Sequence, residues 1–219
     1  MIAFSDRRDA GRQLARRLSH YASRDDVVVL ALPRGGVPVG FEIAEALSAP
    51  LDVFIVRKLG VPGEEELAMG AIASGDVEVL DPGVLARFGV SESELDGVRR
   101  RERRELARRE QVYREERPAL ELEGRTVILV DDGMATGASM RAAVSAVASA
   151  SPGRLVVAVP VAPKSTVLEL RSRVDEFVCL QTPELFEAVG MFYDDFAVTG
   201  DDEVRALLAR RPVPIEASP

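Results

Sequence analysis

Four nearly continuous apolar runs, rich in β-branched residues, narrow the possible folds of this chain more than any other feature. They occupy residues 27–32 (VVVLAL), 51–56 (LDVFIV), 126–130 (TVILV) and 155–161 (LVVAVPV), with a weaker fifth run at 176–180 (EFVCL). Runs without polar alternation are typical of strands that are covered on both faces. The segments 39–47, 139–150 and 165–173 between them have helical spacing. The sequence therefore predicts an α/β fold, with an open, mostly parallel sheet flanked by helices.

The chain has 219 residues, 47% of them apolar, which is enough for one sizeable core. We expect a single domain over residues 1–219, with an insertion at 81–120 and a C-terminal hood segment at 181–200. Ser5 is the expected cap of a first helix, which buries one apolar face made of Ala10, Leu14, Leu18 and Tyr21. Residues 59–70 are polar and contain a Pro-Gly turn, which indicates a surface loop and a candidate lid.

The insertion is dominated by a charged segment, residues 91–117, which holds nine arginines and eight acidic residues. Ser91 and Glu94 have the spacing of a capping box, and Glu105/Arg109 and Glu110/Arg114 have the spacing of helical ion pairs. A sparse apolar stripe is formed by Leu95, Val98, Leu106 and Tyr113. We expect a long, salt-bridged helix that lies over the sheet or at a subunit contact.

Charge and composition exclude several classes of function. A formal net charge of -8 argues against general binding of nucleic acid, because the phosphate backbone would be repelled. No apolar run approaches the length of a membrane span, and the N-terminus does not resemble a signal peptide. Cys179, the single cysteine, lies in an apolar run and is expected in the core. We therefore expect a cytoplasmic protein without membrane or nucleic-acid partners.

The run 126–130 ends in two adjacent carboxylates, Asp131 and Asp132, and then in a loop of small residues and hydroxyls that leads into a helix. Backbone N–H groups of such a loop can close around an anion, and the helix N-terminus adds a positive dipole end. The carboxylates cannot bind that anion, so they face a metal ion or hydrogen-bond donors such as sugar hydroxyls. A phosphate beside vicinal hydroxyls describes a ribose 5-phosphate.

Two further strand ends carry cations. The run 27–32 leads into Pro33-Arg34-Gly35-Gly36, which reads as a second anion site at a helix N-terminus. The run 51–56 ends in Arg57-Lys58, which suits a departing polyanion. Ligands of open parallel sheets bind beyond the carboxyl ends of the strands, where all three segments are expected.

These segments carry a resemblance to a known family. VILVDDGMATGAS resembles the 5-phosphoribosyl-1-pyrophosphate (PRPP) signature of type I phosphoribosyltransferases, and is similar to the VDDLLATGGT version of the adenine enzymes. LPRGG resembles the pyrophosphate loop of that superfamily, and VRKLGVPGEEE the start of its flexible loop. With MGAIASG and AVGMFYDDF, the whole chain looks like a group of predicted phosphoribosyltransferases whose substrate is not established.

The resemblance implies a role for each matching position. Asp131 and Asp132 would face the ribose hydroxyls. The 5-phosphate would be held by Ala135, Thr136, Gly137, Ala138 and Ser139. Pyrophosphate would be surrounded by Arg34, Gly35, Arg57 and Lys58. The cofactor would be Mg²⁺, bridging ligand oxygens near Asp131 or Asp132 with no metal held directly by the protein.

The loop after the run 126–130 lacks a general base, because Ala135 stands where hypoxanthine-guanine enzymes have a carboxylate. Adenine enzymes also have alanine there and use a glutamate of the flexible loop, which favours Glu65, with Glu64 and Glu66 as neighbours. A solvated acidic loop is an equally good interpretation. A base is not needed if the acceptor is already a good nucleophile.

The acceptor is unidentified, and its site is expected in the hood. Phe192 or Tyr193, or Phe186, could stack on a base, and Asp194 or Asp195 could accept from an exocyclic amine. The alternative is that these aromatic side chains cap the core. Lys164 occupies the position of a purine-contacting lysine, although a surface role is the commoner one. The resemblance also implies a homodimer.

Two other functions would each account for part of these sequence motifs. A regulator could bind PRPP without turnover, and the missing loop carboxylate favours it slightly. A phospho-acceptor receiver domain would explain ILVDD alone, but the following phosphate-cradling loop argues against it.

Overall fold

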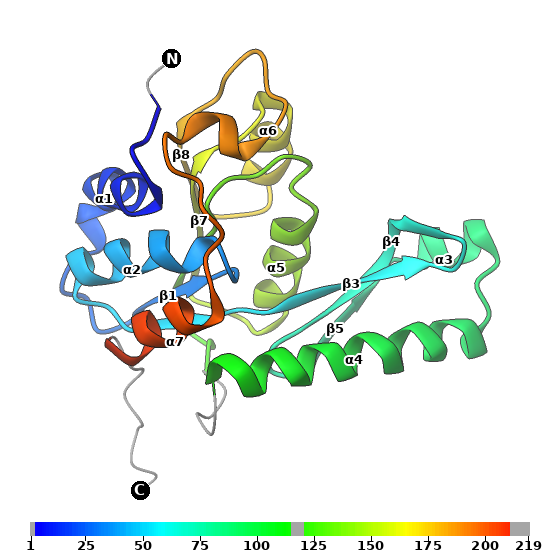
Figure 1. Ribbon diagram of the computed structural model, residues 1–219. Helices are drawn as coiled ribbons and strands as arrows, with labels where there is room; N and C mark the ends of the chain where they lie inside the picture. Colours follow the sequence, from blue (N-terminus) through cyan, green and yellow to red (C-terminus); the bar gives the residue numbers. More distant parts are fainter. Residues whose placement is uncertain (1–2, 115–120, 211–219) are drawn as a thin grey trace, which may run out of the picture.

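The structure of the protein is a computed structural model, which describes residues 3–114 and 121–210. Its centre is a five-stranded parallel sheet in the order β2-β1-β6-β7-β8 (Figure 1). The strands are β1 (Val27–Ala31), β2 (Leu51–Val53), β6 (Thr126–Val130), β7 (Arg154–Val161) and β8 (Glu176–Gln181). Every residue of β1 and β6 is buried, which explains why these runs lack polar alternation. The predicted fold class is confirmed.

Helices cover both faces of the sheet (Figure 1). Along β1, Val27, Val29 and Ala31 pack with the helices α1 (Arg7–Arg17), α2 (Gly36–Leu47) and α7 (Asp201–Arg210). Val28 and Leu30 point to the other face, where they pack with α5 (Ala138–Ser149) and α6 (Lys164–Arg171). The single-residue alternation of a strand thus divides one apolar run between two cores.

The first helix begins one residue later than predicted. Asp6, not Ser5, is the N-cap, and its carboxylate accepts a hydrogen bond from the Asp9 backbone N–H at 2.7 Å. Its apolar face is buried as expected, and Tyr21 lies in a short 3₁₀ helix, η1 (Ser19–Tyr21). A second 3₁₀ helix, η2 (Val189–Phe192), lies in the hood segment.

The run expected at 51–56 is divided between two sheets. β2 ends at Val53, and β3 (Val56–Val61) forms a second, antiparallel sheet with β4 (Glu64–Ala73) and β5 (Val77–Leu80). The surface loop predicted at 59–70 is therefore wrong, because most of it is the β3-β4 hairpin. Leu59, Val61 and Met69 are buried there, and Gly63 has φ +83° in the turn.

The three-stranded sheet is covered by the long helix of the insertion. α3 (Pro82–Phe88) leads into α4 (Glu92–Arg114), whose stripe Leu95, Val98, Leu106 and Tyr113 is buried against the core. Figure 1 shows that α4 and this sheet extend away from the main sheet. The long helix therefore lies over the small antiparallel sheet, and not over the main parallel sheet as the sequence predicts.

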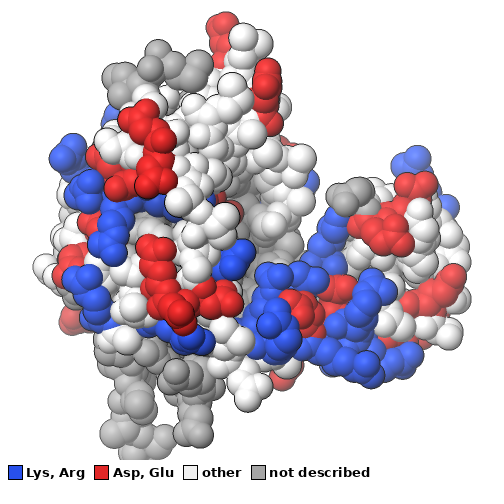
Figure 2. Space-filling model, viewed as in Figure 1, with Lys and Arg blue, Asp and Glu red and all other residues white. Residues whose placement is uncertain are grey.

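Two of the predicted contacts of α4 are present. The Ser91 backbone N–H donates to Glu94 at 2.9 Å and the Glu94 N–H to the Ser91 hydroxyl at 3.3 Å, and Arg109 donates to Glu105 at 2.8 Å. Residues 115–117 and the side chain of Arg114 lie outside the described residues. Figure 2 shows cationic and acidic side chains interspersed over the surface of α4. Among the described helices, none is both long and apolar enough to cross a membrane.

Candidate functional site

The loops after β1 and β6 touch at the carboxyl edge of the main sheet. A Cβ atom added to Gly35 would lie 1.9 Å from Oδ2 of Asp132, and one added to Gly36 would lie 2.8 Å from the Val130 carbonyl oxygen. Only glycine therefore fits at these two positions. The structure brings together the glycine pair and the acidic pair, as the topology predicts.

The two carboxylates of this edge have different environments. Asp131 accepts a hydrogen bond from the Asp132 backbone N–H at 2.9 Å. Burial and the neighbouring Asp132 charge together raise the pKa of Asp131 well above its usual range. Asp132 instead forms an ion pair with Arg7 of α1, with Nε and Oδ2 2.7 Å apart. The pair thus combines a carboxyl that resists ionisation with a carboxylate stabilised by a cation.

The loop 133–137 is held from outside through its carbonyl groups. The Ala135 carbonyl accepts from the Thr166 hydroxyl at 3.0 Å, and the Thr136 carbonyl accepts from the Arg141 guanidinium at 2.8 Å. The Met134 N–H donates to the Val161 carbonyl at 2.9 Å. These bonds fix the loop against β7, α6 and α5, and so preorganise its backbone.

The loop ends at the N-terminus of α5. Gly137 is the N-cap in the left-handed conformation (φ +71°), and an added Cβ there would lie 2.6 Å from Thr166 Cγ2. Ala135, Thr136, Ala138 and Ser139 are placed around this end, and all four are exposed at the surface. First-turn amides and the helix dipole make such an end a good site for an anion.

Arg57 and Lys58 lie on opposite faces of β3, because successive side chains of a strand alternate. Arg57 donates to Glu102 of α4 at 2.6 Å. Lys58 lines a cavity of about 580 Å³ between the three-stranded sheet and α5, together with Ala138 and Ser139. The structure therefore brings Lys58, and not Arg57, to the cavity beside the loop. Burial would raise the pKa of Glu102, but the cations Arg57 and Arg101 hold it below its usual value.

Arg34 and Glu65 lie away from this cavity. The Arg34 guanidinium is 3.7 Å from the Asp201 carboxylate at the start of α7, and its side chain is about half exposed. The Pro33–Arg34 peptide bond is cis. Glu65 is exposed near the β3-β4 turn, where it accepts from the Gly63 N–H at 3.4 Å.

The hood aromatics belong to a small core. Phe192 and Tyr193 are buried with Phe4, and the Tyr193 hydroxyl donates to the Asp132 carbonyl at 2.6 Å. Burial raises the pKa of Tyr193 far above its usual value, so it remains a donor. Phe186 is half-buried and stacks on Phe192, with ring centroids 5.4 Å apart. Of the two interpretations left open by the sequence, core capping describes Phe192 and Tyr193. Asp194 and Lys164 are exposed.

The phosphoribosyl transferase domain family matches residues 5–196, which includes the main sheet and every loop described above. This chain belongs to that family. Two proteins of Mycobacterium tuberculosis, from strains CDC 1551 / Oshkosh and H37Rv, carry provisional phosphoribosyl transferase names and are each 48% identical over 210 residues. The match covers 96% of this chain and 47% of each relative, so the chain spans about half the length of these relatives.

A solved structure is also similar to this phosphoribosyl transferase domain. The crystal structure of TT1426 from Thermus thermophilus has a TM-score of 0.87 and 46% sequence identity. The comparison covers 96% of this chain and 99% of that one.

This phosphoribosyl transferase domain offers only part of a metal shell. Among the described residues, no three His, Cys, Asp or Glu side chains gather as a metal site. Mg²⁺ is commonly bound by one or two carboxylates together with substrate phosphates. Asp131 and Asp132 therefore fit a cation whose other ligands come from a bound molecule.

One residue of the site has no signal in the sequence. Arg7 is one of five arginines in α1, and nothing in its spacing distinguishes it from the other four. The structure places its guanidinium on Asp132, on the Ala197 carbonyl at 2.7 Å, and over the Phe196 ring at 3.8 Å from the centroid. Arg7 thus connects α1, the acidic pair and the hood.

Proposed function

We propose that this domain transfers a 5-phosphoribosyl group from PRPP to a small nucleophile and releases pyrophosphate. The observation that carries the proposal is the arrangement at the end of β6. A loop fixed by its carbonyl groups leads into a helix N-terminus, directly after two carboxylates. This arrangement suits the 5-phosphate and the vicinal hydroxyls of one ribose 5-phosphate.

In the proposed complex, the segment 135–139 binds the 5-phosphate, and Asp131 and Asp132 accept hydrogen bonds from the ribose hydroxyls. Arg7 holds the Asp132 carboxylate at 2.7 Å and keeps it in place for that contact. Gly35 allows the backbone after β1 to approach the same carboxylate. The sugar is thereby oriented by groups on α1, β1 and β6.

In the reaction, the bond from the anomeric carbon to a pyrophosphate oxygen breaks, and a bond to the acceptor nucleophile forms. Positive charge develops on the ribose and negative charge on the leaving pyrophosphate. Lys58 lines the same cavity as Ala138 and Ser139, where its cation would stabilise that charge. Mg²⁺ bound with the ligand would neutralise further charge on the phosphate oxygens.

We assign no proton transfer to Glu65, because it lies near the hairpin turn and does not line the cavity. The acceptor would then lose its proton to solvent or bind already deprotonated. Lys164 and Asp194 are exposed and could contact an acceptor. The acceptor class stays open in this proposal.

A PRPP-binding regulator is the second candidate, and the alanine at position 135 favours it, because that loop position holds no carboxylate. One experiment separates the two. The protein is incubated with PRPP, Mg²⁺ and a pool of purines, pyrimidines and small amines, and ribosyl phosphate adducts and pyrophosphate are measured by mass spectrometry and a coupled assay. An adduct that is absent with Asp131→Asn/Asp132→Asn supports the transferase. PRPP binding without any adduct or pyrophosphate favours the regulator.

A further inference from the structure

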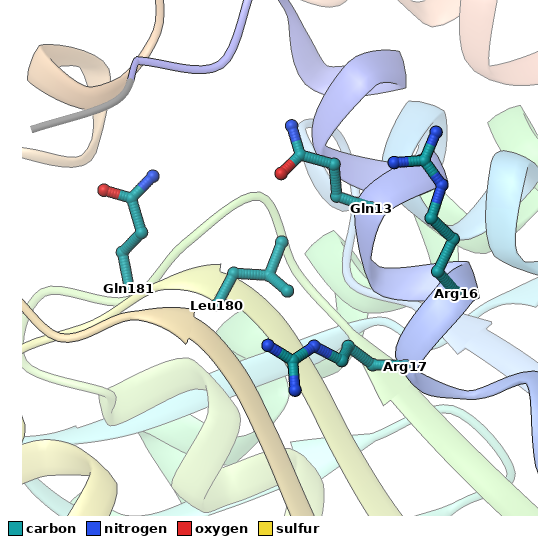
Figure 3. Close-up of a pocket in the computed structure, with 5 residues that line it drawn as sticks. All are labelled: Gln13, Arg16, Arg17, Leu180 and Gln181. Atoms are coloured by element: carbon teal, nitrogen blue, oxygen red, sulfur yellow. The ribbon is translucent and has the colours of Figure 1, made fainter.

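A second cavity lies on the other side of the main sheet from α5, between α1 and the edge strand β8. It has a volume of about 430 Å³ and is lined by Gln13, Arg16 and Arg17 of α1 and by Leu180 and Gln181 of β8 (Figure 3). Figure 3 shows Gln13 and Arg17 extending from the helix toward the strand, with Leu180 between them. None of these residues belongs to the loops that form the proposed PRPP site.

The cavity is cationic in a protein that is acidic overall. Three arginines earlier in α1 have acidic partners, since Arg7 pairs with Asp132 and both Arg8 and Arg12 pair with Glu42. Arg16 and Arg17, in contrast, form no ion pair with any residue that the structure describes. The chain has a net charge of -8, so these two guanidinium groups give the cavity a charge opposite to that of the whole protein.

The acidic groups near this cavity are already engaged. Glu176, at the start of β8, accepts from Tyr21 at 2.6 Å and lies 3.7 Å from Arg154. Asp9 accepts from the Gln13 amide at 3.0 Å, which holds that side chain along the cavity. Arg16 and Arg17 are the charged residues among those that line the cavity.

The lining indicates the class of ligand. Guanidinium groups bind phosphate oxygens through paired N–H donors, so two arginines in the lining of one cavity favour a phosphate over a single carboxylate. The side-chain amides of Gln13 and Gln181 can donate and accept, as the edge of a nucleobase requires, and Leu180 supplies an apolar surface. A volume of about 430 Å³ is within the range of pockets for small molecules.

We propose that the cavity between α1 and β8 binds a mononucleotide, with its phosphate on Arg16 and Arg17 and its base near Leu180 and Gln181. The site is separate from the proposed transfer reaction and does not depend on it. α1 carries a residue of each site, Arg7 at its start and Arg17 at its end, about 15 Å apart along the helix.

The test is a titration of ¹⁵N-labelled protein with AMP, followed by the amide signals of the backbone and of the glutamine side chains. The proposal predicts saturable shifts at residues 13–17 and 180–181. Shifts at 133–139 would report AMP at the phosphate loop, so the two sites are read separately. Inorganic phosphate serves as the second probe, and it should bind at the cavity more weakly than AMP because it lacks the base and sugar.

Arg16→Gln/Arg17→Gln should weaken the binding at the cavity about tenfold or more, because the charge-assisted bonds to phosphate are lost. Arg12→Gln is the matched control, with the same kind of charge removal on the same helix and outside the cavity, and should bind AMP as the wild type does. Both residues of the double variant are exposed, and the spectrum itself verifies folding. Three results would overturn the proposal. They are shifts confined to 133–139, equal affinity in the double variant, and no saturable shift up to about 10 mM AMP.

Discussion

Replacing Gly35 by alanine tests the contact between the loops that follow β1 and β6. The added Cβ would lie 1.9 Å from Oδ2 and 2.5 Å from Cγ of Asp132, whereas real Cβ atoms do not approach other atoms within 3.0 Å. The carboxylate or the loop must therefore move by more than 1 Å. Asp132 cannot move without disturbing its ion pair with Arg7, whose two side chains are only 12% and 15% exposed.

Such overpacking costs about 1–3 kcal/mol of the free energy of unfolding. For a domain of this size, the melting temperature should fall by about 2–4 °C for each kcal/mol. PRPP affinity should fall about tenfold or more, since misplacing a positioning group by about 1 Å can cost up to a hundredfold. Differential scanning calorimetry and isothermal titration calorimetry measure the two effects.

Gly97→Ala is the matched control, because it makes the same chemical change in the exposed part of α4, where an added Cβ meets nothing within 4 Å. It should raise stability by about 0.5–1 kcal/mol and leave PRPP affinity unchanged. If Gly35→Ala kept both the melting temperature and the PRPP affinity of the wild type, the account of this contact would be refuted.

Three further variants test single residues of the site. Asp131→Asn should stabilise the protein without ligand, because the amide cannot take the negative charge that burial and the neighbouring Asp132 disfavour. The raised pKa of Asp131 means that the folded state holds a proton more tightly than the unfolded state. The gain in unfolding free energy should therefore be small below about pH 4 and grow as pH rises. A gain that did not change with pH would contradict this reasoning. Lys58→Gln should lower pyrophosphate affinity severalfold. Arg57→Gln should chiefly lower the free energy of unfolding, by about 1–3 kcal/mol, because it leaves Glu102 without its main partner. If calorimetry showed the reverse pattern, the placement of Arg57 and Lys58 on opposite faces of β3 would be rejected. Tyr193→Phe should cost about 1–3 kcal/mol of unfolding free energy by leaving the Asp132 carbonyl without its donor, and an unchanged denaturant midpoint would show that this bond contributes nothing.

The sequence predicts the main sheet well because burial on both faces leaves a direct signal, namely apolar runs without alternation. It fails at 51–56, where the same kind of run serves two sheets and Phe54 and Ile55 lie between the two strands. It fails again at 59–70, because the consecutive glutamates of the hairpin give this segment the polar composition of a loop. The buried residues of the hairpin pack on a helix about 30 residues later in the chain. Such long-range packing has no local pattern.

The site is predictable where geometry follows from topology. Asp131, Asp132 and the loop 135–139 lie together because they are contiguous and follow a central strand. Arg57 and Lys58 point to opposite faces because a strand continues through them, where the sequence predicts that a strand ends. Arg7 has no signal, because its partner Asp132 is 125 residues away.

The central claim is that the loop after β6 and its acidic pair bind PRPP. The most direct measurement is the stabilisation of the wild type and of Asp131→Asn/Asp132→Asn by increasing PRPP in the presence of Mg²⁺. The account predicts a melting temperature that rises with PRPP for the wild type, as linkage requires, and a folded double variant whose melting temperature barely responds. Equal stabilisation of the two proteins, or none of the wild type, would contradict it.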